Sequence, residues 1–136
     1  MKNGEKSMFL GTFKPSVVGR GRIALPKKIR EELKSKRVVL TIGFETCVFG
    51  FSEEAWNEVV RPELEKPFFS DAAARNMRRK MGMNAMIAAL DSQGRVVVPD
   101  SMLLYAGIEN NITLIGAGDH FELWDTNKWK SYAENL

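Results

Sequence analysis

The chain has 136 residues, with 20 Lys and Arg, 17 Asp and Glu, one His, one Cys and a formal net charge of +3. A chain of this length folds as one domain, or as two small halves that share a core, without a disulfide or a metal ion. One Cys excludes an internal disulfide, one His and one Cys exclude the usual zinc sites, and no apolar run approaches the ~18 residues of a membrane span.

No targeting segment and no catalytic signature stand out. The first seven residues are polar, and the apolar stretch at 8–13 is too short and too interrupted for a secretory signal peptide. His120 has no nucleophile elbow or comparable partner motif. We therefore expect a cytoplasmic protein that is not an enzyme, with no cofactor, no membrane contact and no small-molecule substrate.

The small net charge conceals an asymmetry along the chain. Residues 1–40 contain eleven Lys or Arg and three Glu, a surplus of +8, whereas residues 41–136 contain 9 basic and 14 acidic residues, a balance of −5. A basic segment of this kind favours a polyanionic partner. The alternative is a solvated basic face without a partner.

The predicted elements of the N-terminal half alternate strands with short helices. Gly21 supplies a turn at which positive φ costs nothing, Pro26 suits the first position of a helix, and Ser52 is a favoured N-cap. The expected elements, in chain order, are strands at 11–17, 22–25, 38–42 and 47–51, and helices at 27–35 and from 52 onward.

A connector with two prolines and many basic residues follows. Pro62 and Pro67 mark breaks, and Ser70 is expected to cap a helix over 71–81. The helix carries a basic cluster between Arg75 and Lys80. Three interpretations of this cluster stay open: a solvated face, a surface that pairs with an acidic part of another subunit, or an auxiliary nucleic-acid contact.

The C-terminal half repeats the N-terminal half at an offset of 73 residues, so that the segment 18–26 resembles the segment 91–99. The second copy is expected to form strands at 85–90, 95–98, 112–115 and 120–124, and helices at 100–106 and from 125 onward. Two copies suggest a pseudo-twofold pair of β-rich halves. The expected units are an extension at 1–7, copies at 8–60 and 81–132, and the connector at 61–80.

Several short motifs, taken in order, resemble one protein family. They are Met8-Phe9-Leu10-Gly11, the Gly-Arg-x-x-x-Pro unit at 21–26, its second copy at 91–99, Ile115-Gly-Ala-Gly-Asp119 and Glu122-Leu-Trp124. Asp71-Ala-Ala-Ala-Arg75 also resembles the helix between that family's repeats. The ordered set runs from Met8 to about Tyr132 and resembles the MraZ family of AbrB-like transcription regulators.

The resemblance implies a β-rich α+β fold of two swapped-hairpin β-barrel repeats with short flanking helices. It also implies a ring-shaped homo-oligomer, associated with the nucleoid. Such an assembly binds direct DNA repeats upstream of the division and cell-wall gene cluster, usually controlling its own operon. The family signature Asp-x-x-x-Arg is present as Asp91 and Arg95, whereas the first copy has Val18 and Arg22.

The turn of the first copy is the predicted DNA-reading surface. Arg22 and Arg20 offer bidentate donors to guanine edges or phosphates, and Gly21 lets the backbone approach closely. The predicted phosphate contacts are Lys14, Lys27 and Lys28. The alternative is an exposed hairpin tip with solubilising charges.

In the second copy, Asp91 and Arg95 are expected to form a structural pair across the turn. The acidity of this copy favours a scaffold or oligomerisation role. Two other functions stay open beside the regulator. One is an antitoxin-like AbrB regulator, and the other is a non-enzymatic oligomeric scaffold that binds protein or RNA through its basic N-terminal end.

Overall fold

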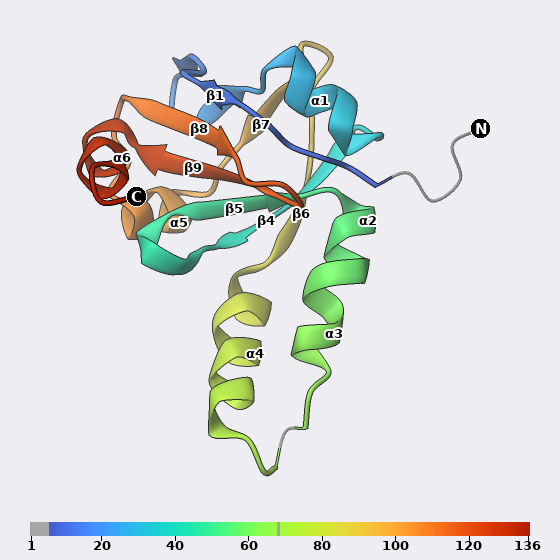
Figure 1. Cartoon of the computed structure of the whole chain (residues 1–136). Coiled ribbons are helices and arrows are strands. Elements are labelled where there is room, and N and C mark those ends of the chain that lie inside the picture. The colour runs from blue at the N-terminus through green and yellow to red at the C-terminus, as the bar shows by residue number, and fades with distance from the viewer. Residues whose placement is uncertain (1–5, 68) are drawn as a thin grey trace.

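The computed structural model describes residues 6–67 and 69–136, and two antiparallel β-sheets carry its fold (Figure 1). The larger sheet has the strand order β1-β8-β9-β5-β4-β6 and the smaller sheet has the order β2-β3-β7. The larger sheet consists of β1 (Thr12–Phe13), β8 (Ile112–Gly116), β9 (Phe121–Asp125), β5 (Val48–Phe51), β4 (Arg37–Ile42) and β6 (Met86–Ala89). The smaller sheet consists of β2 (Val17–Val18), β3 (Arg22–Ala24) and β7 (Arg95–Val97).

Both sheets combine strands from the two copies of the repeat. β1 pairs with β8, and β6 pairs with β4. The first strand of each copy therefore pairs with a strand of the other copy within the larger sheet. Ile23 lies opposite Val96 in the β3–β7 pair, and Phe49 lies opposite Glu122 in the β5–β9 pair. Both pairs are separated by 73 positions in the sequence. A pseudo-twofold axis therefore passes through these two strand pairs.

Within the described residues neither sheet closes into a barrel, which corrects the expectation of β-barrel repeats. β1 and β6 lie at opposite edges of the larger sheet, and the β2–β3 hairpin joins β7 in a separate sheet. The strand expected at 11–17 is divided between β1 and β2 because the chain changes sheets there. Pro15, which has no N–H to donate to a ladder, lies at this crossing. The architecture is mixed α/β, with strand-rich sheets and several helices.

Two short helices occupy equivalent places after the prolines. α1 (Lys27–Leu33) follows Pro26, and α5 (Asp100–Ala106) follows Pro99. α1 ends two residues before the predicted end at 35, because Lys34 adopts a left-handed conformation with φ of 59°. Both helices bury an apolar face in the main core, which also contains the inward side chains of both sheets.

A helical hairpin projects from one side of the larger sheet (Figure 1). Its first arm is α2 (Glu53–Ala55), the π-helical stretch η2 (Trp56–Val60) and α3 (Arg61–Leu64), and its second arm is α4 (Ala72–Asn84). Ser52 caps the first arm, as predicted, by accepting a hydrogen bond from the Ala55 N–H at 3.0 Å. The predicted cap Ser70 is wrong. Asp71 caps α4 instead, with its Oδ1 accepting from the Ala74 N–H at 3.1 Å.

A second apolar cluster joins the hairpin to the sheet. Phe49, Phe51, Val60, Met81 and Trp124 are buried in it. The last helix, α6 (Thr126–Ala133), begins at the N-cap Asp125 and packs Trp129 against Trp124. Across residues 6–67 and 69–136, no helix combines the length and the apolar character needed to cross a membrane.

Candidate nucleic-acid interface

The two strands β3 and β7, called the arginine ribbon below, present one buried and one outward face. Ile23 and Val96 are buried on the pseudo-twofold axis, with no more than 1% of either exposed. Because side chains alternate along a strand, their neighbours on both sides point outward. The outward face carries Arg22 opposite Val97 and Arg95 opposite Ala24, so both arginines share it.

The turn at residues 19–21, the first turn, holds Arg22 in position. Gly21 has a φ of +76°, and its carbonyl oxygen accepts a hydrogen bond from the Val98 N–H at 2.8 Å. A Cβ atom at this position would lie 2.7 Å from the Val98 carbonyl oxygen. Only glycine fits both the conformation and the space. The first turn is therefore tied to a strand end of the second copy.

The two arginines at the first turn differ in their surroundings. Arg20 pairs with Asp100 of α5, with 3.2 Å between Arg20 Nε and Asp100 Oδ1, and both side chains are well exposed. Such a pair contributes at most about 1 kcal/mol and is easily exchanged for another anion. Arg22 is exposed and forms no side-chain hydrogen bond or ion pair with residues 6–67 or 69–136. Its donors face solvent.

The turn at residues 92–94, the second turn, is organised around Asp91. Asp91 Oδ1 accepts hydrogen bonds from the N–H groups of Gln93 and Arg95, each at 2.9 Å. Asp91 Oδ2 lies 2.8 Å from Arg95 Nε. These bonds, led by the one from the Arg95 N–H, lower the pKa of the Asp91 carboxyl. Val18 occupies the equivalent place in the first copy and has no oxygen to accept such bonds.

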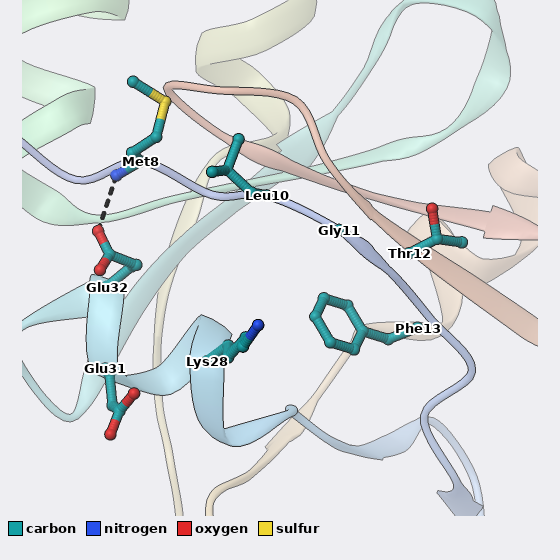
Figure 2. Close-up of a pocket in the computed structure, with 8 residues that line it drawn as sticks. All are labelled: Met8, Leu10, Gly11, Thr12, Phe13, Lys28, Glu31 and Glu32. Carbon is teal, nitrogen blue, oxygen red and sulfur yellow. Dashed lines mark hydrogen bonds between the residues drawn. The ribbon is translucent and has the colours of Figure 1, made fainter.

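The three lysines predicted to contact phosphates lie apart from one another. Lys14 is exposed after β1. Lys28 points into a cleft of about 550 Å³ between α1 and β1, which Phe13, Glu31 and Glu32 also line (Figure 2). Lys27 lies beside the second turn, not the first. The structure therefore brings Arg20, Gly21 and Arg22 together without these lysines.

Each turn packs against the helix of the other copy, and this exchange explains the placement of the lysines. The Leu25 N–H donates to the Gly94 carbonyl at 3.1 Å, as the Val98 N–H does to that of Gly21. Asp100 lies beside the first turn and Arg30 beside the second. Neither contact was predicted, because a repeat offset does not say which copy a turn contacts.

A separate polar cluster lies at the start of β9. His120 Nδ1 is 2.7 Å from Asp119 Oδ1, and His120 Nε2 is 2.7 Å from Glu122 Oε2. Burial lowers the pKa of His120, but the hydrogen bonds with Glu122 and Asp119 outweigh it, and the net pKa is raised. The imidazole stacks on Phe51, with 5.3 Å between ring centroids. These contacts fix the ring between two strands of the sheet.

The cysteine shows no sign of chemical activation. Cys47 is fully buried, and this burial raises the pKa of its thiol far above the usual range. In the part of the chain that the structure describes, no group of three or more His, Cys, Asp or Glu side chains is placed to hold a metal ion. Neither Cys47 nor a metal-ligand group in the described residues therefore competes with the outward face of the arginine ribbon as a candidate site.

Comparisons with known proteins match almost the whole chain. The family model described as "MraZ protein, putative antitoxin-like" matches residues 8–79 and 81–136. A protein of Acetivibrio thermocellus named transcriptional regulator MraZ is 36% identical over 95% of this chain and 90% of its own length. Proteins of the same name are 40% identical in Arthrobacter sp. (92% and 87%) and 35% identical in Marinobacter nauticus (94% and 88%).

Proposed function

The chain belongs to the MraZ family, and from this membership we propose that it is a DNA-binding transcriptional regulator and not an enzyme. The relatives named transcriptional regulator align with this chain over nearly their whole length. One observation on this chain carries the proposal further. The exposed Arg22 stands on the outward face of a two-stranded antiparallel ribbon, beside a glycine turn.

The ribbon suits the major groove of B-DNA. The groove is about 12 Å wide and admits a two-stranded β-ribbon, and arginine reads guanine there through two parallel hydrogen bonds. Arg22 supplies these donors without first breaking an ion pair. Arg20 exchanges Asp100 for a phosphate. Gly21 is buried against Val98 and Leu103, so the close approach to the sugar–phosphate chain falls to the exposed backbone of Gly19.

The remaining sites have supporting roles in this proposal. Lys14, Lys27 and Lys28 contact phosphates on either side of the groove. Asp91 holds Arg95 at the second turn, where the pair keeps the turn in shape. The two copies, 8–60 and 81–132, act as swapped-hairpin units that share their strands, with the connector 61–80 between them.

The assembly and the target complete the proposal. A ring-shaped homo-oligomer in the cytoplasm, associated with the nucleoid, places several ribbons on direct DNA repeats. The repeats lie upstream of the division and cell-wall gene cluster that contains its own operon. One ribbon neutralises few phosphates, so simultaneous engagement of several repeats supplies the affinity by raising the effective concentration.

Fluorescence anisotropy with a duplex from the region upstream of its own gene tests the function. The wild type is expected to bind this duplex more tightly than an unrelated duplex or an RNA of equal length. Arg22→Ala is expected to lose about 5- to 150-fold of that preference, the worth of one bidentate base contact. Lys130→Ala, which removes an exposed charge from α6, is the matched control and is expected to keep the preference.

Two outcomes would count against the proposal. Equal affinity of the wild type for all three nucleic acids contradicts a sequence-specific regulator and favours the RNA- or protein-binding scaffold. A larger loss with Arg95→Ala than with Arg22→Ala reverses the assignment of the two turns. Selection of bound duplexes from random DNA, repeated with Arg22→Ala, then identifies which base pair each arginine reads.

A further inference from the structure

The duplication creates two equivalent clefts, one behind each turn of the arginine ribbon. The first-turn cleft, of about 450 Å³, lies between the first turn and α5. The second-turn cleft, of about 300 Å³, lies between the second turn and α1. Corresponding positions line both clefts at the offset of 73 residues: Gly21 and Gly94, Asp100 and Lys27, Leu103 and Arg30, Glu109 and Lys36.

The charges of the two clefts are opposite. The second-turn cleft is lined by three basic residues, Lys27, Arg30 and Lys36. Its two acidic residues are Asp91, whose charge is neutralised by Arg95, and Glu31. The equivalent residues of the first-turn cleft are Asp100, Leu103 and Glu109, and Arg20 is its cation. Part of the basic surplus of the N-terminal segment therefore lies at the second turn, although these residues come from the first copy.

Side-chain packing over the second turn does not by itself require a positive charge. Arg30 folds over the second turn, with its Cδ 2.4 Å from the place where a Cβ of Gly94 would lie, and its Nε donates to the Leu25 carbonyl at 3.1 Å. Leu103 covers Gly21 in the same way, with its Cδ1 2.9 Å from the corresponding point. A leucine thus suffices to pack this position. The arginine and the two lysines provide something that packing alone does not explain.

The position of the second-turn cleft points to its ligand. Gly21 and Gly94 bond to Val98 and Leu25, so the two turns lie at opposite ends of the ribbon. Four residues at about 3.4 Å each separate these ends by about 14 Å. This length matches the roughly 12 Å width of the major groove. A ribbon seated in the groove brings its two ends to the two bordering phosphate backbones.

We propose that the second-turn cleft is a phosphate-binding site, which holds the DNA backbone at the groove edge away from Arg22. Arg30 and Lys36 are its new members, and Lys27 acts there and not at the first turn. Arg30 uses the guanidinium N–H groups that its bond to Leu25 leaves available. Lys27 and Lys36 form no ion pair with the described residues 6–67 and 69–136. The inference rests on the proposed DNA-binding function.

The salt dependence of DNA affinity tests this site. Each neutralised phosphate adds about 0.9 to the slope of log K against log salt. Arg30→Leu and Lys36→Gln are each expected to reduce the slope by about 0.9. Affinity then falls about 8-fold at 0.1 M salt and is unchanged on extrapolation to 1 M. Both variants should keep the wild-type preference for the upstream duplex, because phosphate contacts do not read sequence.

Matched controls separate this proposal from the general function. Arg30→Leu copies the natural Leu103, and thermal unfolding of both variants checks that they fold. Lys130→Gln removes one charge from α6 and is expected to leave the slope unaltered. Unchanged slopes for Arg30→Leu and Lys36→Gln overturn the phosphate site while leaving the function intact. Loss of sequence preference in these variants also overturns it, since they would then contact bases. Absence of any DNA binding by the wild type overturns the function itself.

Discussion

Ile23 and Val96 face each other across the β3–β7 pair on the pseudo-twofold axis of the molecule. Their pairing places Arg22 and Arg95 in equivalent backbone positions on one outward face. The two arginines nevertheless differ, because Asp91 holds Arg95 and Val18 leaves Arg22 without such a partner. The difference between Val18 and Asp91 at equivalent positions thus leaves Arg22 available for a ligand, while Arg95 is held by its ion pair.

Gly21→Ala is expected to destabilise the protein by roughly 2–4 kcal/mol, since it combines positive φ with a collision in a packed site. The new Cβ would lie 2.7 Å from a backbone oxygen. Gly19→Ala is the matched control, because Gly19 also has positive φ but no atom within 4 Å of the added Cβ. That variant should lose only the cost of the left-handed conformation, roughly 1–2 kcal/mol. Urea unfolding of both measures the difference, and equal losses would contradict the contact between the first turn and Val98.

Asp91→Asn is expected to lower the melting temperature at neutral pH, because the amide accepts hydrogen bonds from Arg95 and Gln93 less strongly than the carboxylate. The pKa of Asp91 is lowered in the folded protein, so its stabilisation is present above the unfolded value near 3.8. This stabilisation is lost as pH falls through the folded pKa. Melting curves of both proteins should therefore converge in acid. A constant difference between them at all pH values would refute the carboxylate's role.

His120→Gln is expected to remove a pH dependence of stability. The pKa of His120 is raised above 6.5 in the folded protein, so its stabilisation is complete below the unfolded pKa and is lost as pH rises through the folded one. The wild-type melting temperature should fall between pH 6 and 8, below the range in which Cys47 ionises in the unfolded chain. The variant should show a flatter profile. Identical profiles would show that the bonds to Asp119 and Glu122 carry no net effect.

Thr41→Val is expected to cost roughly 1–3 kcal/mol by leaving a buried carbonyl without its donor. The Thr41 hydroxyl is fully buried and donates to the Met81 carbonyl at 3.0 Å, which ties α4 to β4. Valine has nearly the same shape, so the loss reports the hydrogen bond more than the packing. Thr12→Val on the exposed edge strand β1 serves as the control, with a change expected within about 0.5 kcal/mol. Chemical denaturation measures the free energy of unfolding of both variants, and equal losses would contradict a stabilising role for the Thr41–Met81 hydrogen bond.

Local chemistry predicted most elements but not their partners. Pro26, Pro99, Ser52 and Asp125 mark helix starts that the structure confirms, because caps and fixed φ angles act within a few residues. Ser70 and Asp71 are adjacent and both are favoured N-cap residues, so residue type alone does not choose between them. The division of the strand at 11–17 depended on a change of sheet, which is a non-local event.

The candidate site shows the same limit. Arg20, Gly21 and Arg22 adjoin one another in sequence, so their proximity followed directly. Lys27 lies beside the second turn because strands are exchanged between copies, and the charge pattern along the chain contains no trace of that exchange. Periodicity and spacing describe each copy by itself, so they do not show which copy a turn contacts.

The strand exchange also has a consequence for synthesis on the ribosome. Thr12 pairs with Ile115, 103 positions later in the chain. At 5–20 residues per second, translation of that interval takes roughly 5–20 s. β1 and the ribbon strand β3 therefore leave the ribosome well before β8 and β7 exist. The nascent first copy therefore lacks the strand partners of β1 and β3, and a chain that terminates before β7 cannot form the β3–β7 pair.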